Sequence, residues 1–186
     1  MGYSEKDINT FVKKSLGEGG FGFKIADPPK ATAMTASKNP FDGFGVLQAS
    51  NVLDLRVRPK DEFVPLYWES KFLSGMSAFS LKRIEEHQAY YLDRSMLLGN
   101  SFSVVPLGVY AKRGEVRVYL FHWASLAPLY RKGFSFHKKY LELLPYNQVT
   151  LKTGTFKIEH VIIREDIERV YGAGIYEEEQ DAKGQL

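Results

Sequence analysis

An apolar run that ends in two charged residues is the feature that most limits how this chain can fold. Residues 63–72 read Phe-Val-Pro-Leu-Tyr-Trp-Glu-Ser-Lys-Phe, and this composition predicts a strand. The part before Glu69 is hydrophobic enough for an inner strand, where an unpaired ionised group would be costly. Glu69 and Lys71 share one face of the strand because successive side chains alternate. The sequence therefore predicts an acid and an amine together at the end of a buried strand.

The segments around this strand predict an α/β (α+β) fold, a restriction-endonuclease-like mixed central sheet flanked by helices. Helical spacing of apolar residues predicts helices at 4–16, 81–98 and 125–130. Apolar runs between turn residues predict further strands at 22–26, 41–47, 52–58, 102–111 and 115–123, the last two paired as a hairpin. Residues 27–40 are rich in Pro, Lys, Thr and Ala and predict an exposed loop or arm. We expect one nuclease domain over residues 1–172 and a flexible acidic tail over residues 173–186.

Composition excludes several classes of site. The 186 residues include no cysteine, so disulfides and thiolate metal sites are unavailable. The four histidines are too far apart for a zinc motif, so any bound metal should be held by oxygen. No stretch approaches the length of apolar sequence that crosses a membrane, and we expect a cytoplasmic protein with no membrane partner. The net charge is +3, and the acidic tail leaves a modest basic bias on the rest of the chain.

A second carboxylate is needed to make Glu69 part of a metal site, and Asp42 is the better candidate. Asp42 follows Pro40 and precedes two closely spaced glycines, where the backbone can approach a ligand. Asp42 and Glu69 on neighbouring strands could hold Mg²⁺, which prefers oxygen ligands, and Mn²⁺ should substitute for it. Asp54 is the alternative, but its strand face also carries Arg56 and Arg58, as an exposed edge would. Taken alone, Glu69 and Lys71 are better explained by a solvated ion pair than by a site.

The order of these motifs resembles the RecU-type Holliday junction resolvases of the PD-(D/E)XK nuclease superfamily. That family has a catalytic Asp in an Asp-x-x-Gly-Val context, a strand ending in Glu-x-Lys, the segment Ala-Phe-x-Leu-Lys, and a helix bearing His-Gln. The chain offers, in the same order, Asp42-Gly43-Phe44-Gly45-Val46, Glu69-Ser70-Lys71, Ala78-Phe79-Ser80-Leu81-Lys82 and His87-Gln88. The resemblance is specific from Asp42 to about Leu92, and it is general elsewhere.

This resemblance implies a catalytic role for five residues. Asp42 and Glu69 would be metal ligands, joined by the backbone carbonyl of Ser70, and Lys71 would be the catalytic lysine. Gln88 would support the site from its helix, and Glu5 would be a further acid that reaches the metal through water. The implied activity is a Mg²⁺-dependent endodeoxyribonuclease that cuts a four-way junction symmetrically and leaves 5′-phosphate and 3′-hydroxyl ends.

Two symmetric cuts favour a homodimer, because a two-fold axis places two active sites on one junction. Lys and Arg supply the sequence-independent part of DNA binding. The candidate DNA-binding residues are Lys13, Lys14, Lys30, Lys38, Lys82, Arg83, Arg131, Lys132, Lys138 and Lys139. Two alternatives remain open: a nuclease of the same type acting on flaps, ends or duplex DNA, and a non-catalytic DNA-binding module.

Overall fold

A mixed sheet flanked by helices forms the centre of the computed structural model, which describes residues 3–16, 22–24, 41–75, 77–111 and 114–177. The helices are α1 (Glu5–Ser15), α2 (Glu86–Met96), α3 (Trp123–Arg131), α4 (Lys138–Leu141) and α5 (Arg164–Tyr171), with 3-10 turns η2 (Ala49–Asn51), η3 (Leu81–Arg83) and η4 (Ala173–Tyr176). The strands are β1 (Gly22–Lys24), β2 (Gly43–Gln48), β3 (Phe63–Trp68), β4 (Lys71–Leu73), β5 (Ala78–Ser80), β6 (Phe102–Tyr110), β7 (Val116–His122), β8 (Ser135–His137) and β9 (Asn147–Gln148).

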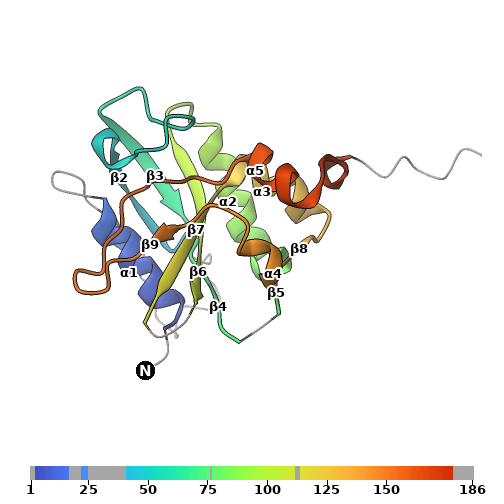
Figure 1. The fold of residues 1–186 in the computed structure, drawn as a ribbon. Coiled ribbons are helices and arrows are strands. Elements are labelled where there is room, and N and C mark those ends of the chain that lie inside the picture. Colours follow the sequence, from blue (N-terminus) through green and yellow to red (C-terminus); the bar gives the residue numbers. More distant parts are fainter. Residues whose placement is uncertain (1–2, 17–21, 25–40, 76, 112–113, 178–186) are drawn as a thin grey trace, which may run out of the picture.

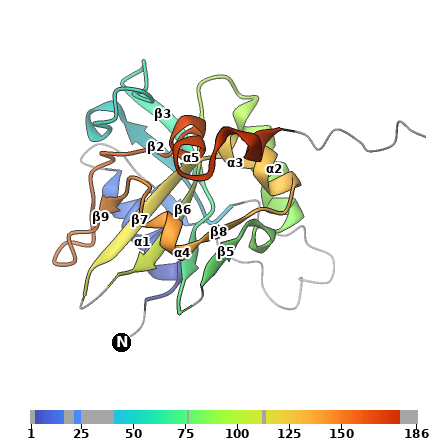
Figure 2. The same ribbon diagram turned by 45° about the vertical axis from the view of Figure 1, so that its right-hand side comes forward.

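The main sheet has the strand order β1-β2-β3-β6-β7-β9, and β4 continues beyond β3 along β6. The neighbours β1–β2, β2–β3, β6–β7 and β7–β9 are antiparallel, whereas β3 and β4 both pair with β6 in parallel. The parallel pairing needs a crossover connection, and α2 lies within it. Strands β5 and β8 form a separate two-stranded ribbon beside α4 (Figures 1 and 2). The predicted fold class is therefore confirmed.

The two long central strands are buried on both faces, which explains their almost continuous apolar sequence. On β7, Val116, Val118 and Leu120 belong to the core cluster that also contains residues of α1. Their neighbours Tyr119 and Phe121 belong to the opposite cluster, which contains residues of α2 and α3. Figure 1 shows β6 and β7 in the middle of the molecule, with α1 near the N-terminus and α2 beyond the strands.

A glycine on β6 allows α1 to lie close to the sheet. A Cβ atom built at Gly108 would lie 2.1 Å from Cδ1 of Ile8, which is fully buried. Only a residue without a side chain leaves room for Ile8 at this position. Helix α1 is therefore held directly against the strand that pairs with β3 and β4.

The predicted strand at 52–58 is wrong. The segment turns instead, because the Asp54 carboxylate accepts hydrogen bonds from the Arg56 backbone N–H and guanidinium at 2.7–3.0 Å. Arg56 also binds Asp166 at the start of α5, and both aspartates are buried. Leu53 and Leu55, which the alternation assigned to a common strand face, are both exposed, Leu55 by 80%. The alternation of apolar and charged residues at 52–58 therefore belongs to a turn that is held by ion pairs, and not to a strand.

Other predicted boundaries shift for local reasons. The helix expected at 81–98 begins as η3, and α2 starts only at Glu86. The strand expected at 63–72 is interrupted at Glu69 and Ser70, between β3 and β4. The first helix and the hairpin are present at nearly the expected positions, and α3 extends the helix expected at 125–130 to Trp123–Arg131.

The C-terminal segment is packed further than expected. Residues 173–176 of the predicted tail form η4, and the Tyr176 hydroxyl donates a hydrogen bond to the Ser125 carbonyl at 2.9 Å. Residues 178–186 and the whole of the predicted arm at 27–40 lie outside the described residues. Within the described part of the chain, no helix is long and apolar enough to cross a membrane.

Candidate active site

The register of the β2–β3 pair brings the two predicted carboxylates together. Gly43 pairs with Trp68 in this antiparallel ladder, so the next step outward sets Asp42 opposite Glu69. Directly opposite residues on antiparallel strands have their Cβ atoms about 4.5–5.5 Å apart. Two residues that are distant in sequence are therefore neighbours at the end of the hairpin.

The Glu69 carboxylate accepts a hydrogen bond from the backbone of Asp42, and the Asp42 carboxylate accepts one from the backbone next to Glu69. The Asp42 N–H donates to Oε2 of Glu69 at 3.1 Å, and the Ser70 N–H donates to Oδ2 of Asp42 at 3.0 Å. The Asp42 carboxylate thus takes the place that a neighbouring strand carbonyl would occupy, which explains the interruption between β3 and β4. The reciprocal bonds fix how the two side chains face one another.

The predicted amine also lies in this group. Nζ of Lys71 is 2.7 Å from Oε1 of Glu69, and the two residues are only 5% and 2% exposed. A solvated surface ion pair is therefore excluded as the explanation of the Glu-x-Lys motif. Removing two charges from water is costly and is tolerated only when each is well partnered.

Gln88 supplies further partners from α2. Its Nε2 donates to Oε1 of Glu69, and its Oε1 lies 3.4 Å from Nζ of Lys71. The same Oε1 accepts from the Glu85 N–H at 2.8 Å, which orients the amide through the first turn of the helix. The structure therefore brings Asp42, Glu69, Lys71 and Gln88 together.

The electrostatic balance of the group is set mainly by burial. Burial raises the pKa of Glu69 to about 7, opposed by the positive charge of Lys71 and reinforced by the negative charge of Asp42. Two acids side by side in a buried site disfavour one another's ionised form. A divalent cation between them would relieve this repulsion.

Glu5 is not part of this group. Its carboxylate forms an ion pair with Arg83 at 2.8 Å, and Arg83 also donates to the carbonyl of Phe72 on β4. Among the described residues, no three His, Cys, Asp or Glu side chains gather in a way that could hold a metal ion. The alternative acid Asp54 binds Arg56 and the Val161 N–H instead.

The donor set suits a hard divalent cation, but the oxygens of Glu69 already accept hydrogen bonds. Asp42 and Glu69 offer carboxylate oxygens, and Mg²⁺ takes one or two protein carboxylates together with waters and phosphate oxygens. Both Glu69 oxygens accept hydrogen bonds from protein donors, so a cation would have to compete with Gln88 and Lys71. Beside this group, the Ser70 hydroxyl is buried and has no hydrogen-bond partner among the described residues.

Sequence reasoning missed Asn9, which joins α1 to the same place. Its Nδ2 donates to the Asp42 carbonyl at 3.2 Å, and its Oδ1 accepts from Nε1 of Trp68 at 3.0 Å. The signal in the sequence was its position one residue after Ile8 on the inward stripe of the first helix. A polar residue beside such a stripe requires partners when it is buried.

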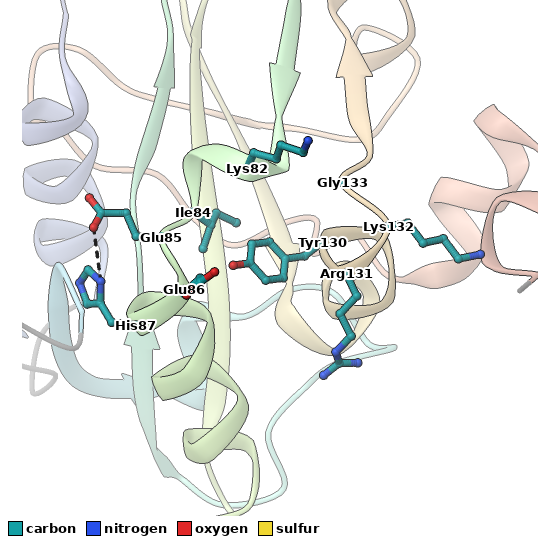
Figure 3. A pocket seen from close by; sticks show the side chains of 9 residues that line it. All are labelled: Lys82, Ile84, Glu85, Glu86, His87, Tyr130, Arg131, Lys132 and Gly133. Atoms are coloured by element: carbon teal, nitrogen blue, oxygen red, sulfur yellow. Dashed lines mark ion pairs between the residues drawn. The ribbon is translucent and has the colours of Figure 1, made fainter.

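A pocket of about 940 Å³ lies at the N-terminal end of α2 and the C-terminal end of α3. Three of the predicted DNA-binding residues line it: Lys82, Arg131 and Lys132. Figure 3 shows the Tyr130 hydroxyl and the Glu86 carboxylate pointing toward one another inside the pocket, while the charged ends of Arg131 and Lys132 point outward. Arg131 pairs with Asp93 at 3.2 Å, and Lys132 donates to the carbonyl of Ile175 at 3.2 Å.

The remaining predicted basic residues are spread over the surface. Lys13 and Lys14 lie in the last turn of α1, Lys138 and Lys139 begin α4, and Arg83 is paired with Glu5. Lys30 and Lys38 lie outside the described residues. The structure therefore groups only part of the predicted set, at the pocket beside α2.

No protein-family model matches the chain, and no curated protein matches it.

Proposed function

We propose that this chain is a metal-dependent DNA endonuclease of the PD-(D/E)XK type that resolves four-way junctions. The observation that carries the proposal is the β2–β3 register, which sets Asp42 opposite Glu69 with the Lys71 amine 2.7 Å from the same carboxylate. Two acids can hold a metal ion that polarises a phosphate and activates a water, and the amine adds a positive charge beside it. The resemblance to RecU-type resolvases, which rests on other residues as well, supports the same reaction.

In this proposal, Asp42 and Glu69 would hold Mg²⁺, or Mn²⁺ in its place. The bound ion would supply Lewis-acid polarisation of the scissile phosphate and would lower the pKa of a water. Lys71 would donate hydrogen bonds to the phosphate oxygen on which negative charge develops, or to the attacking water. Gln88 would orient both Glu69 and Lys71, because its amide contacts both side chains.

The proposed substrate is branched DNA, and the proposed assembly is a cytoplasmic homodimer. Lys82, Arg131 and Lys132 beside the α2 N-terminus would contact the phosphate backbone, because lysine and arginine supply the sequence-independent part of DNA binding. A four-way junction needs two symmetric cuts, which a two-fold dimer provides.

The test compares three DNAs of matched sequence: a four-way junction, a flap and a linear duplex. Wild type in Mg²⁺ is expected to cut the junction with paired, symmetric nicks that leave 5′-phosphate ends. Asp42→Asn keeps the shape of the side chain and removes its charge, and cleavage is expected to fall by at least 100-fold. Equal cutting of all three DNAs would leave a nuclease with another substrate, and no metal-dependent cutting would refute the proposal.

A second candidate function is a non-catalytic DNA-binding module, and one observation favours it. The Glu69 carboxylate is already saturated by Lys71, Gln88 and the Asp42 N–H, as a purely structural ion pair would be. This alternative predicts junction binding that is indifferent to Mg²⁺ and unchanged in Asp42→Asn. A gel-shift titration with and without Mg²⁺, run beside the cleavage assay, separates the two functions.

A further inference from the structure

A single buried amide on α1 bridges the two strand ends that carry the candidate site. Asn9 is 5% exposed, and it contacts the backbone carbonyl of Asp42 with one end and the indole of Trp68 with the other. Trp68 is the last residue of β3, and Glu69 follows it directly. From this contact we infer that Asn9 is a positioning residue that fixes Asp42 relative to Glu69, an inference that rests on the proposed function.

The chemistry of the two partners allows only one orientation of the amide. An indole N–H is a donor only, so it must face the amide oxygen, and a backbone carbonyl is an acceptor only, so it must face the amide nitrogen. Asn9 accepts from Trp68 at 3.0 Å and donates to Asp42 at 3.2 Å, as this requires. The Trp68 bond therefore keeps the Asn9 donor directed at Asp42.

The helix that carries Asn9 is itself anchored at two points in the turn before this contact. Ile8, the preceding residue, lies against Gly108 on β6, where no side chain would fit. Glu5, one turn earlier, is paired with Arg83, which binds the Phe72 carbonyl on β4. Because α1 is packed against the sheet, the hydrogen bond from Asn9 fixes the backbone of Asp42 relative to that helix.

A structural role alone would make a different prediction. If Asn9 only satisfies the buried Trp68 N–H, its loss lowers the stability of the fold but leaves the affinity of the folded protein for metal unchanged. A positioning role changes the metal affinity of the folded protein as well. Residues that orient metal ligands through hydrogen bonds typically contribute 10-fold to 100-fold in metal affinity.

The experiment measures Mn²⁺ binding to the full chain by isothermal titration calorimetry, with unfolding by urea recorded for every variant. Trp68→Phe removes the indole donor but keeps the Asn9 amide, which still faces its acceptor, the Asp42 carbonyl. Adding Asn9→Leu to Trp68→Phe then removes only the bond to Asp42. The double variant is expected to bind Mn²⁺ about tenfold more weakly than Trp68→Phe alone.

Two controls keep the inference separate from the proposed function. Thr10→Ala changes an exposed neighbour on the same helix, and it is expected to bind Mn²⁺ as wild type does. Wild-type binding that Asp42→Asn does not weaken would overturn the proposed function. Binding that depends on Asp42, but is equal in Trp68→Phe and in the double variant, would overturn only the positioning role of Asn9.

Discussion

Replacing Gly43 by alanine should destabilise the fold through one steric conflict. A Cβ atom at this position would lie 2.0 Å from Cζ2 and 2.2 Å from Cε2 of Trp68. Non-bonded carbons are most favourable at about 3.5–4.0 Å, so the indole would have to move by about 1.5 Å. Trp68 is fully buried and donates to Asn9, so such a movement also breaks a buried hydrogen bond.

The expected magnitude follows from two contributions. Overpacking a core position typically costs about 1–3 kcal/mol, and a buried hydrogen bond contributes about 1 kcal/mol. The smaller backbone entropy of alanine in the unfolded chain offsets about 0.4–1 kcal/mol of this. We therefore expect Gly43→Ala to lower the free energy of unfolding by about 1–4 kcal/mol. Equilibrium urea unfolding, followed by tryptophan fluorescence and circular dichroism, measures this change.

A double-mutant cycle identifies the cause. Trp68→Phe replaces the indole by a ring that does not reach as far across Gly43, so adding Gly43→Ala to it should cost less than about 1 kcal/mol. The reasoning is refuted if Gly43→Ala alone is within about 0.5 kcal/mol of wild type. It is also refuted if the alanine is equally destabilising with phenylalanine at position 68, because the conflict would then lie elsewhere.

Three further predictions concern other parts of the molecule. Because burial raises the pKa of Glu69 from its ordinary value near 4.5 to about 7, the folded state retains a proton that the unfolded state loses. The free energy of unfolding of wild type, measured with urea, should therefore fall by up to about 3 kcal/mol as the pH rises from about 4.5 to about 7. Glu69→Gln should remove this part of the pH dependence. Arg56→Met leaves the buried Asp54 and Asp166 without their shared cation, and it should cost about 3 kcal/mol in the same assay, whereas Arg58→Met should be neutral. Gly108→Ala should separate α1 from the sheet and lower the unfolding midpoint in urea, and an unchanged midpoint would show that the helix is not held there.

The strand-based part of the site could be read from the sequence because it depends on a local period. Glu69 and Lys71 are two positions apart, so strand alternation predicted a common face, and the two side chains do meet although the strand is interrupted at Glu69 and Ser70. Gln88 was expected beside them from the family resemblance, and α2 brings its amide to both side chains. The sequence favoured Asp42 over Asp54 only through the residues around each acid. The β2–β3 register, which sets Asp42 opposite Glu69, became visible only in the structure.

The rest could not be read because it depends on contacts between distant segments. The buried Asp54 carboxylate binds Arg56, and Arg56 also binds Asp166, which is 112 positions from Asp54. Nothing in the local alternation distinguishes this arrangement from an exposed strand. Asn9 was overlooked because a polar residue early in a helix is ordinary, and its partners come from two strands. Long-range polar pairing of this kind leaves little trace in the sequence around each residue.

The ionic turn at Arg56 also bears on the order in which the chain folds. Its guanidinium joins the segment before β3 to the first turn of α5, 110 positions later. Bringing together the ends of so long a loop has an entropic cost that must be met before the bonds form, and contacts at high sequence separation slow folding. We expect the β2–β3 and β6–β7 hairpins to assemble first and the closure by Arg56 to come late. During synthesis on the ribosome, the protein would accordingly reach its final packing only after α5 has emerged.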